Sequence, residues 1–281
     1  MKYATIKAHE AEFGVRLMCR ALGVSPSGFY AWRGRSPSGR ARNRAELDRL
    51  VRQEFERRRG RAGAPRLSRH LGRGRRLVAQ SLRRQDLRAK AARKFKATTN
   101  SKHKLPVAAN LLQQDFTASR PNWVWVGDIT YIATDEGWVY LAVVLDLFSR
   151  KVVGWSMADR MTATLVCDAL RMALFRRKRP RGVIMHTDRG SQYCSGEHRA
   201  LLAQNGLVAS MSAKGNCFDN AAMESWNHSL KVEAIHGERF ATRAEATAQV
   251  FEYIELDYNR DRLHSTLGYL SPDQFERAYA A

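Results

Sequence analysis

The spacing of apolar residues divides the chain into a helical N-terminal part and a mixed C-terminal part. Apolar positions recur at helical intervals up to about residue 90, predicting two helices within 14–33 and basic helices over 42–59 and about 66–90. The stretch 91–120 is polar and basic with little periodicity, so it predicts a linker. The N-terminal part is therefore predicted to be all-α.

From residue 121 onward, short runs rich in valine, isoleucine and tryptophan replace the helical spacing. Three such runs with short gaps predict an antiparallel meander, and helices then alternate with two more strands. The predicted strands are Trp123–Ile132, Val139–Leu147, Lys151–Met157, Val183–His186 and Leu207–Met211, and the predicted helices are Thr162–Arg177, 196–205, Asp219–Ile235 and Arg243–Tyr258. This order predicts an α/β fold of the RNase H-like kind, with a mixed five-stranded sheet flanked by helices.

Charge is distributed as unevenly as hydrophobicity. The 281-residue chain has a formal net charge of +21. Residues 1–105 hold 29 Lys/Arg and 7 Asp/Glu, a net of +22, which leaves 19 basic and 20 acidic residues, a net of −1, for the rest. A solvated basic surface is the bland explanation, but arginine runs such as 57–61 exceed what solubility requires. The N-terminal third is therefore predicted to bind nucleic acid, and the linker to lie along DNA.

We expect three units: a helix-turn-helix-like DNA-binding segment over 1–40, a basic helical DNA-binding region with its linker over 41–105, and a catalytic core with C-terminal helices over 118–281. In the first, Ser25 is a ready N-cap and Pro26 suits the first helical turn. A DNA-binding helix-turn-helix fits this pattern, and so does a plain helical hairpin. In the second unit, the predicted apolar stripe consists of Leu67, Leu71, Leu77, Leu82 and Leu87.

The four cysteines are scattered without a CxxC pair, so they predict reduced thiols rather than disulfides or a zinc site. The first 30 residues lack the apolar region of a signal peptide, and no run of about 18 apolar residues exists. We therefore expect a cytoplasmic protein without a membrane partner, associated with the nucleoid if the predicted DNA binding holds.

Three acidic residues lie where the predicted order would bring them together. Asp128 lies within the first strand, Asp188 just follows the fourth, which should run beside the first, and Glu224 lies early in the helix from 219. A carboxylate among apolar residues is costly to bury unless a cation compensates it. Each acid alone would also suit a sheet end, where it accepts backbone hydrogen bonds. Together they predict a site for two Mg²⁺ ions, with Mn²⁺ as a substitute, about 3.5–4 Å apart.

Helical phase indicates which residues share the face of Glu224. Lys231 follows Glu224 by seven residues and falls within about 20° of the same face, and Asn227 lies there too. Both are therefore predicted to reach a phosphate. Glu233 falls on the opposite face, where we expect it to face solvent.

These residues resemble those of a known family. Between Asp188 and Glu224 lie 35 residues, as in the Asp, Asp-35-Glu signature of retroviral integrases and bacterial insertion-sequence transposases. The motifs that carry the resemblance are Leu22–Ser25, Gly28–Trp32, Trp125–Ile132, Val144–Trp155, His186–Tyr193, Met211–Ser225 and Tyr258–Pro272. On these motifs the chain is identified as a member of the OrfB-type transposases of the insertion-sequence-three family. Ala62 stands where a tyrosine is common, which weakens only the N-terminal match.

The resemblance implies that Asp128, Asp188 and Glu224 are catalytic metal ligands. It implies DNA strand cleavage by metal-activated water, followed by attack of a 3′-hydroxyl on target DNA. The partners implied are the terminal inverted repeats, the target DNA and an upstream OrfA protein, separate or in an OrfA-OrfB frameshift fusion. Because two DNA ends must be held, we expect a homodimer or a higher multimer.

The other candidates are predicted DNA contacts and supporting residues. The DNA contacts are Lys214, Asn216, Asn227 and Lys231 near the acids, and Arg66, Arg73, Arg75 and Arg76 in the basic region. His186 either supports the acids from behind or contacts DNA, or is a packed histidine at a strand end. Asp146 is expected to pair with Arg150 rather than to bind metal.

Two other functions remain open on the residues alone. An RNase H-like nuclease without strand-transfer activity would share the three acids but would not need the basic N-terminal part. A non-enzymatic DNA-binding regulator would use the basic part but would leave three convergent acids without a role.

Overall fold

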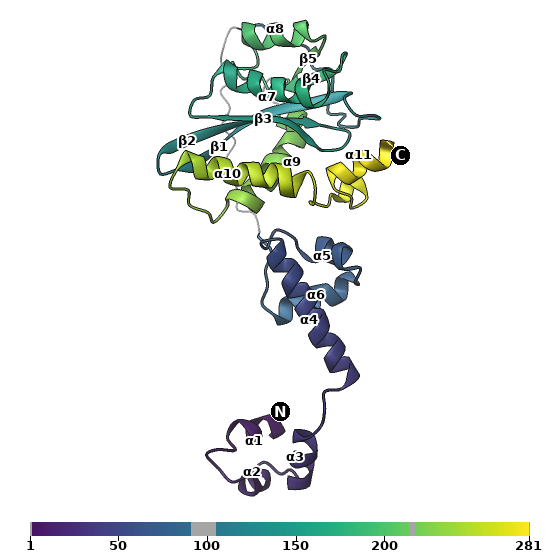
Figure 1. Ribbon diagram of the computed structural model, residues 1–281, viewed down its shortest axis with the longest axis vertical. Coiled ribbons are helices and arrows are strands. Elements are labelled where there is room, and N and C mark those ends of the chain that lie inside the picture. Colours follow the sequence, from purple (N-terminus) through teal and green to yellow (C-terminus); the bar gives the residue numbers. More distant parts are fainter. Residues whose placement is uncertain (1, 91–104, 214–216, 281) are drawn as a thin grey trace.

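The computed structural model describes residues 2–90, 105–213 and 217–280. The molecule is elongated, with a small helical unit at the N-terminal end, a second helical unit in the middle and the sheet-containing core at the other end (Figure 1). None of the helices in these described ranges is long and apolar enough to cross a lipid bilayer.

The N-terminal unit packs α1 (Lys2–Ala8), α2 (Val15–Ala21) and α3 (Pro26–Arg33) around a small apolar core. The Ser25 hydroxyl accepts a hydrogen bond from the backbone N–H of Gly28 at 3.2 Å, so the predicted cap does start α3. The two helices predicted within 14–33 are thus present, which fits a helix-turn-helix and a plain helical hairpin alike, while α1 has no counterpart in the sequence pattern. That this unit binds DNA stays a prediction.

The middle unit consists of α4 (Gly39–Arg57), α5 (Ala64–Leu71) and α6 (Arg75–Arg84). The helical stretch predicted over 66–90 is interrupted, because Gly72 adopts a left-handed φ of +58° and ends α5. Helix α6 then restarts the helical phase. Leu77, predicted to pack, is consequently 52% exposed, and Val78 takes the inward position instead.

The core contains the predicted mixed five-stranded sheet, and its strand order is β3-β2-β1-β4-β5. Its strands are β1 (Val124–Thr134), β2 (Gly137–Asp146), β3 (Val152–Ala158), β4 (Ile184–Thr187) and β5 (Val208–Met211). The first three form the antiparallel meander, whereas β4 runs parallel to β1 and β5 parallel to β4. The central strand β1 is therefore flanked by β2 and β4.

Helices cover both faces of this sheet (Figure 1). Helices α7 (Ala163–Arg176) and α8 (Gly196–Gln204) contribute to the apolar core on one face, while α9 (Ala221–Leu230) and α10 (Arg243–Glu252) contribute to the core on the other. Gly154 allows α7 to lie close to β3, because a Cβ there would overlap backbone atoms of α7. The remaining elements are η1 (Cys217–Asn220), η2 (Lys231–Ile235), η3 (Tyr253–Tyr258), η4 (Ser265–Leu267) and α11 (Pro272–Ala280), of which η2 and η3 are π-helical continuations of α9 and α10.

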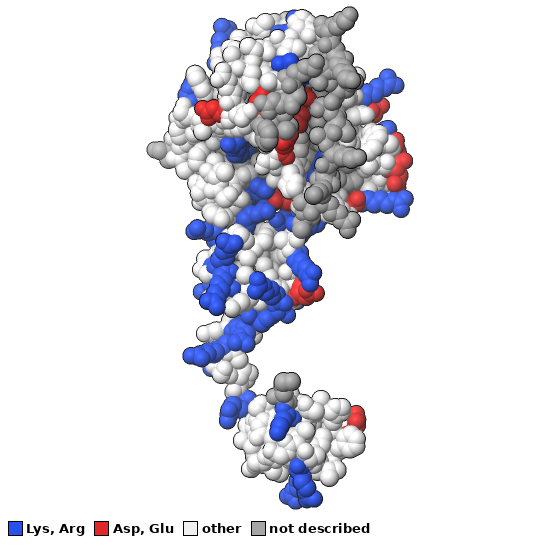
Figure 2. All heavy atoms as spheres, turned by 180° about the vertical axis from the view of Figure 1, so that it is seen from behind, with Lys and Arg blue, Asp and Glu red and all other residues white. Residues whose placement is uncertain are grey.

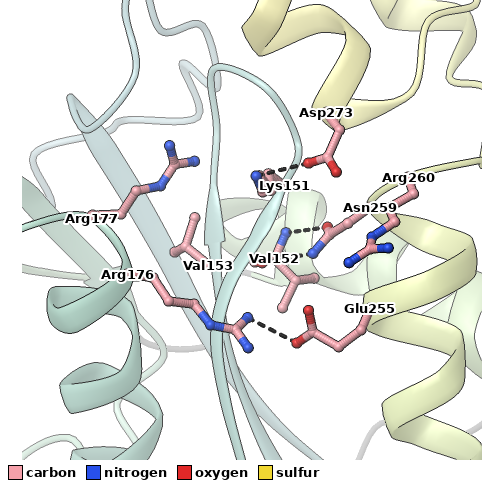
Figure 3. A pocket seen from close by; sticks show the side chains of 9 residues that line it. All are labelled: Lys151, Val152, Val153, Arg176, Arg177, Glu255, Asn259, Arg260 and Asp273. Atoms are coloured by element: carbon pink, nitrogen blue, oxygen red, sulfur yellow. Dashed lines mark hydrogen bonds and ion pairs between the residues drawn. The ribbon is translucent and has the colours of Figure 1, made fainter.

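Both edges of the sheet are covered by other segments. At the β3 edge, the side-chain amide of Asn259 donates to the carbonyl of Val152 at 3.0 Å and accepts from its N–H at 2.9 Å, as a neighbouring strand would (Figure 3). A cavity of about 270 Å³ beside this contact is lined by ion-paired groups such as Arg176 and Glu255. At the β5 edge, the N–H of Met211 donates to the carbonyl of Ala109 at 3.3 Å. The end of the predicted linker thus packs against the core, while 91–104 lie outside the described residues.

Candidate active site

Asp128 lies in the central strand, opposite Val143 of β2 and one residue beyond the last pair with β4, so the strand pairing fixes its backbone. Its half-buried carboxylate accepts two hydrogen bonds. Oδ1 accepts from the N–H of Ile129 at 2.9 Å, and Oδ2 accepts from the side-chain amide of Asn227, on α9, at 2.8 Å. One oxygen is thus held by the strand itself and the other by the helix that carries Glu224.

Asp188 directly follows β4 and lies next to Asp128. The parallel register of β1 and β4 pairs Gly127 with Thr187, so the residues that follow these two emerge side by side. The Oδ1 atom of Asp188 accepts from the N–H of Gly190 at 2.9 Å. The tight turn after β4 therefore orients this carboxylate.

Glu224 lies in the first turn of α9, which packs on the sheet through Met223 and Trp226. Its side chain is exposed. Residues three apart lie on one helical face, so Glu224 shares the face of Asn227, whose amide contacts Asp128. The predicted helical phase is therefore correct for this part of the helix.

The three acids influence one another electrostatically. The pKa of Asp128 is raised from its ordinary 3.8 to about 7. Burial is the largest cause and repulsion from Asp188 the second, with a smaller contribution from Glu224, while the hydrogen bonds from Ile129 and Asn227 act in the opposite direction. Burial beside Asp128 and Asp188 also raises the pKa of the Tyr193 phenol. A divalent cation between the two aspartates would relieve this repulsion.

The acids suit a hard divalent ion in chemistry but are not gathered into a complete ligand set. Carboxylate oxygens are the ligands that Mg²⁺ prefers, and two carboxylates with water commonly suffice. In residues 2–90, 105–213 and 217–280, however, no three His, Cys, Asp or Glu side chains lie close enough together to hold one ion. Asp128 and Asp188 thus form a ready pair, and Glu224 lies on the neighbouring helix face without completing it.

His186 is a packed histidine that supports the loop leading into α9. It is fully buried; Nδ1 lies 2.8 Å from the Ser210 hydroxyl, and Nε2 lies 3.0 Å from the carbonyl of Asp219. The Asp219 carboxylate in turn accepts from the Asn110 amide at 2.9 Å and from the N–H of Ala213 at 2.7 Å. These contacts are those of a packed histidine, and they link His186 through Asp219 to the start of the Glu224 helix, so a role in supporting the acids stays a prediction.

Sequence reasoning did not identify the residues that surround the acids. Tyr193, Ser210 and Asp219 each contribute a buried polar group there. Tyr193 and Asp219 belong to the motifs that flank Asp188 and Glu224, which is the one signal that could have singled them out. Their partners are set by tertiary contacts rather than by spacing along the chain.

The structure places the predicted DNA contacts in different settings. Asn227 contacts Asp128, and the Lys231 ammonium lies 5.2 Å from the ring centre of Tyr131. Arg73 and Arg75 line a cavity of about 480 Å³ with Arg69, whereas the Arg66 guanidinium donates to Glu233 at 2.9 Å. Arg76 is exposed. The candidates Lys214 and Asn216 lie outside the described residues.

Two expectations about acids are wrong. Glu233, predicted to face solvent, is only 4% exposed. It follows the buried Trp226 by seven residues, so it lies on the helix face that packs inward, where Arg66 and Arg262 reach it. Asp146 does not pair with Arg150. It is fully buried, and its carboxylate accepts from the N–H groups of Asn122 and Phe148 and lies 3.6 Å from Arg177.

Basic side chains gather on the middle unit, as Figure 2 shows from the opposite side. The exposed arginines of this unit include Arg42, Arg44, Arg49, Arg52, Arg57, Arg59, Arg69, Arg73, Arg75, Arg76, Arg83, Arg84 and Arg88. Several pair with acids on the same helix, such as Arg49 with Glu46. The charge asymmetry of the sequence thus becomes a basic surface next to the core.

Comparison with known proteins identifies the class of enzyme and then the family. Two family models, both described as "Integrase core domain", match residues 118–217 and 224–278. The transposase InsF for insertion sequence IS3A of Escherichia coli (strain K12) is 58% identical over 98% of both chains. An uncharacterized 31 kDa protein of insertion element IS600 of Shigella sonnei is 46% identical over 93% of this chain and 98% of its own.

The chain is therefore a transposase with an integrase catalytic core, which makes it a polynucleotidyl transferase that acts on DNA. It belongs to the IS3 family of insertion-sequence transposases.

Solved structures give a weaker likeness. The simian T-cell lymphotropic virus intasome chain is 18% identical, with a TM-score of 0.44 over 76% of this chain and 70% of that chain. The HTLV-2 integrase catalytic core domain in complex with magnesium is 17% identical, with a TM-score of 0.41 over 57% of this chain and 99% of that chain. At these TM-scores the likeness supports no argument about mechanism.

Proposed function

We propose that this transposase cleaves and joins DNA strands at Asp128, Asp188 and Glu224, which hold two Mg²⁺ ions or Mn²⁺ in their place. The observation that carries the proposal is the adjacent pair of aspartates on β1 and β4, whose mutual repulsion contributes to raising the pKa of Asp128 to about 7. A divalent cation bound between these two carboxylates would offset the cost of placing them side by side and partly out of water. Bound divalent ions would supply charge stabilisation for the attacking and leaving oxygens at phosphorus.

The chain's own residues would orient this chemistry. Ile129 and Asn227 hold the two oxygens of the Asp128 carboxylate, and the N–H of Gly190 holds Oδ1 of Asp188, so the orientation of both carboxylates is fixed before metal binds. Glu224 would complete the ligand set when α9 moves closer to β1 with DNA and metal bound. Lys231, which follows Glu224 by seven residues, would contact a phosphate.

The proposed reaction consists of two displacements at phosphorus. In the first, water attacks phosphorus at the element end, and the bond to the 3′-oxygen breaks, leaving a free 3′-hydroxyl. In the second, that hydroxyl attacks a phosphodiester of target DNA, and the target's own 3′-oxygen leaves. One bond forms and one breaks in each step, so joining needs no other energy source.

The basic N-terminal parts would hold the DNA. We propose that α2 and α3 dock as a helix-turn-helix on the terminal inverted repeats, and that Arg73, Arg75 and Arg76 contact the backbone. The cavity lined by Arg69, Arg73 and Arg75 offers room for a phosphate group. Two subunits would hold the two element ends, with an upstream OrfA protein as partner or fused segment.

A strand-transfer assay tests this proposal. The protein would be incubated with a labelled end of its own element, a supercoiled target and Mg²⁺ or Mn²⁺, beside Asp188→Asn and Glu224→Gln. Asp159→Asn, which removes one exposed acid elsewhere, is the matched control. We expect joined products that disappear in the two site variants, persist in the control and require metal, with DNA binding retained throughout. Nicking without joining would favour a nuclease, and full activity of either site variant would refute the assignment.

A further inference from the structure

Glu233 is the centre of a buried ionic cluster at the junction of the helical units and the core. Its Oε1 accepts from Arg66 at 2.9 Å and from Arg262 at 3.0 Å. Its Oε2 accepts from Arg262 at 2.9 Å and from the Tyr253 hydroxyl at 3.0 Å. At 4% exposure, the carboxylate is thus saturated by groups from three different parts of the chain.

The same point is also held through its backbone. The Nε of Arg61, which precedes α5, donates to the carbonyl oxygen of Glu233 at 3.0 Å. The Nη1 atom of Arg61 donates to Asp257, on η3, at 2.6 Å. Arg61 is itself buried, so this contact between the middle unit and the core is part of the protein interior rather than a surface encounter.

Glu233 lies on the helix that carries the candidate active-site residues. Segment η2 continues α9 without a break, so Glu224, Asn227 and Lys231 precede Glu233 on one helical rod. Arg262 also donates to Ser229 on α9 at 2.9 Å. The middle unit and the C-terminal segment therefore both contact the far end of the helical rod whose first turn holds Glu224.

Stability alone does not account for such an arrangement. A buried ion cluster has a large desolvation cost, and well-packed apolar residues are often at least as stabilising. What the cluster does provide is a fixed geometry between two parts of the chain. A π-helical turn is moreover an uncommon conformation that is frequent at functional sites.

We propose that Glu233 is a positioning residue for strand cleavage and transfer, which through Arg66 and Arg262 sets the helix of Glu224 relative to the DNA-binding middle unit. DNA docked on α4–α6 would then act on the active site through Arg61, Arg66 and Glu233, with no contact to Glu224 itself. The proposal rests on the function assigned above to Glu224.

Arg66→Ala tests this coupling, because Arg66 belongs to the middle unit and Glu233 keeps Arg262 as a partner in this variant. The matched control is Glu252→Gln, which breaks another ion pair between middle unit and core, Arg59 with Glu252, on α10 rather than on the α9 rod. Arg66→Lys serves as the conservative variant. All proteins are the full chain, and a thermal melt of each establishes that it is folded.

The first readout is hydrogen exchange of residues 221–235 without DNA or metal. We expect roughly tenfold faster exchange in Arg66→Ala, partial recovery in Arg66→Lys and no change in Glu252→Gln. Unchanged exchange in Arg66→Ala, or equal acceleration in Glu252→Gln, would overturn the proposal. This readout needs no catalysis, so it is independent of whether Glu224 proves to be a metal ligand.

The second readout is the Mg²⁺ concentration for half-maximal strand cleavage, measured at saturating DNA. We expect it to rise about tenfold in Arg66→Ala and to stay within about twofold of wild type in Glu252→Gln. A purely structural role would lower the melting temperature without changing the metal requirement, and that result would also overturn the proposal.

Discussion

Two groups of carboxylates in this protein have electrostatic surroundings of opposite sign. Glu233 is surrounded by cations, and Arg262 and Arg66 outweigh the effect of burial, so that its pKa is held below the usual value. Asp128 is also withdrawn from water, but its ionisable neighbours are Asp188 and Glu224, and its pKa rises to about 7. Arginines thus offset the charge of Glu233, whereas neighbouring carboxylates add to the raised pKa of Asp128. The contrast favours the second group as the site where a cation from outside would bind.

The largest expected effect is the loss of catalysis when Asp128 changes. Asp128→Asn keeps the size of the side chain but removes a proposed metal ligand, so strand cleavage should fall by about a thousandfold or more. Cleavage of a labelled element end at pH 8 measures this. Activity within tenfold of wild type would place the metal site elsewhere and remove the basis of the comparison.

Removal of the Glu233 carboxylate should lower the stability of the folded protein. Glu233→Ala leaves the partly buried Arg262 and Arg66 without this counter-charge, which costs about 3 kcal/mol and lowers the melting temperature by roughly 10 °C. Glu238→Ala is the matched control, because Glu238 pairs with Lys90 across the same junction but is exposed. Equal, small shifts for the two variants would mean that the cluster around Glu233 does not hold the junction together.

Removal of the Asp128 charge should have the opposite effect and raise the stability of the metal-free protein. Without metal, folded Asp128 keeps its proton up to about pH 7, whereas an unfolded aspartate loses it near 3.8. The native state therefore loses stability as pH rises through this window, and Asp128→Asn should escape that loss. Melting curves at pH 8 without metal should place the variant several degrees above wild type, with the difference disappearing near pH 4.

The same titration predicts how metal binding depends on pH. Protons compete with the ion for Asp128 below about pH 7, so Mg²⁺ affinity should increase between pH 6 and 8 and then level off. Calorimetric titration of the metal measures this. Affinity that is flat over the whole range would contradict the raised pKa.

The smallest expected effect concerns the exposed basic surface. Arg75→Ala should weaken binding to any DNA sequence to a similar degree and lower the salt slope of the affinity by about one. Arg59→Ala is an informative control, because Arg59 is already paired with Glu252. A change in sequence preference instead would mean that Arg75 contacts bases.

Much of the core could be predicted because its elements are short, regular and close in sequence. The sheet order follows from three strands with short gaps and two strands separated by helices, and the adjacency of Asp128 and Asp188 follows from that order. The position of Glu224 beside Asn227 follows from helical phase alone. These are local or topological properties, which a single sequence does encode.

The failures lie where tertiary contacts decide. Helical phase correctly put Glu233 opposite Glu224, but that face packs inward, and Arg66, whose guanidinium pairs with Glu233, is 167 residues away in sequence. Leu77 is exposed because the left-handed turn at Gly72 resets the helix. Asp146 pairs with Arg177 rather than with the nearby Arg150. The distant arginine partners leave no periodic signal along the chain.

The most direct test of the central claim is to count the metal ions. The protein bound to an element end would be titrated with Mn²⁺, and free Mn²⁺ would be followed by electron paramagnetic resonance, for wild type and for Asp188→Asn. We predict two tightly bound ions per subunit in wild type, with at least one lost in the variant. Equal numbers of bound ions in the two proteins would contradict the claim that the aspartate pair on β1 and β4 holds the catalytic metal.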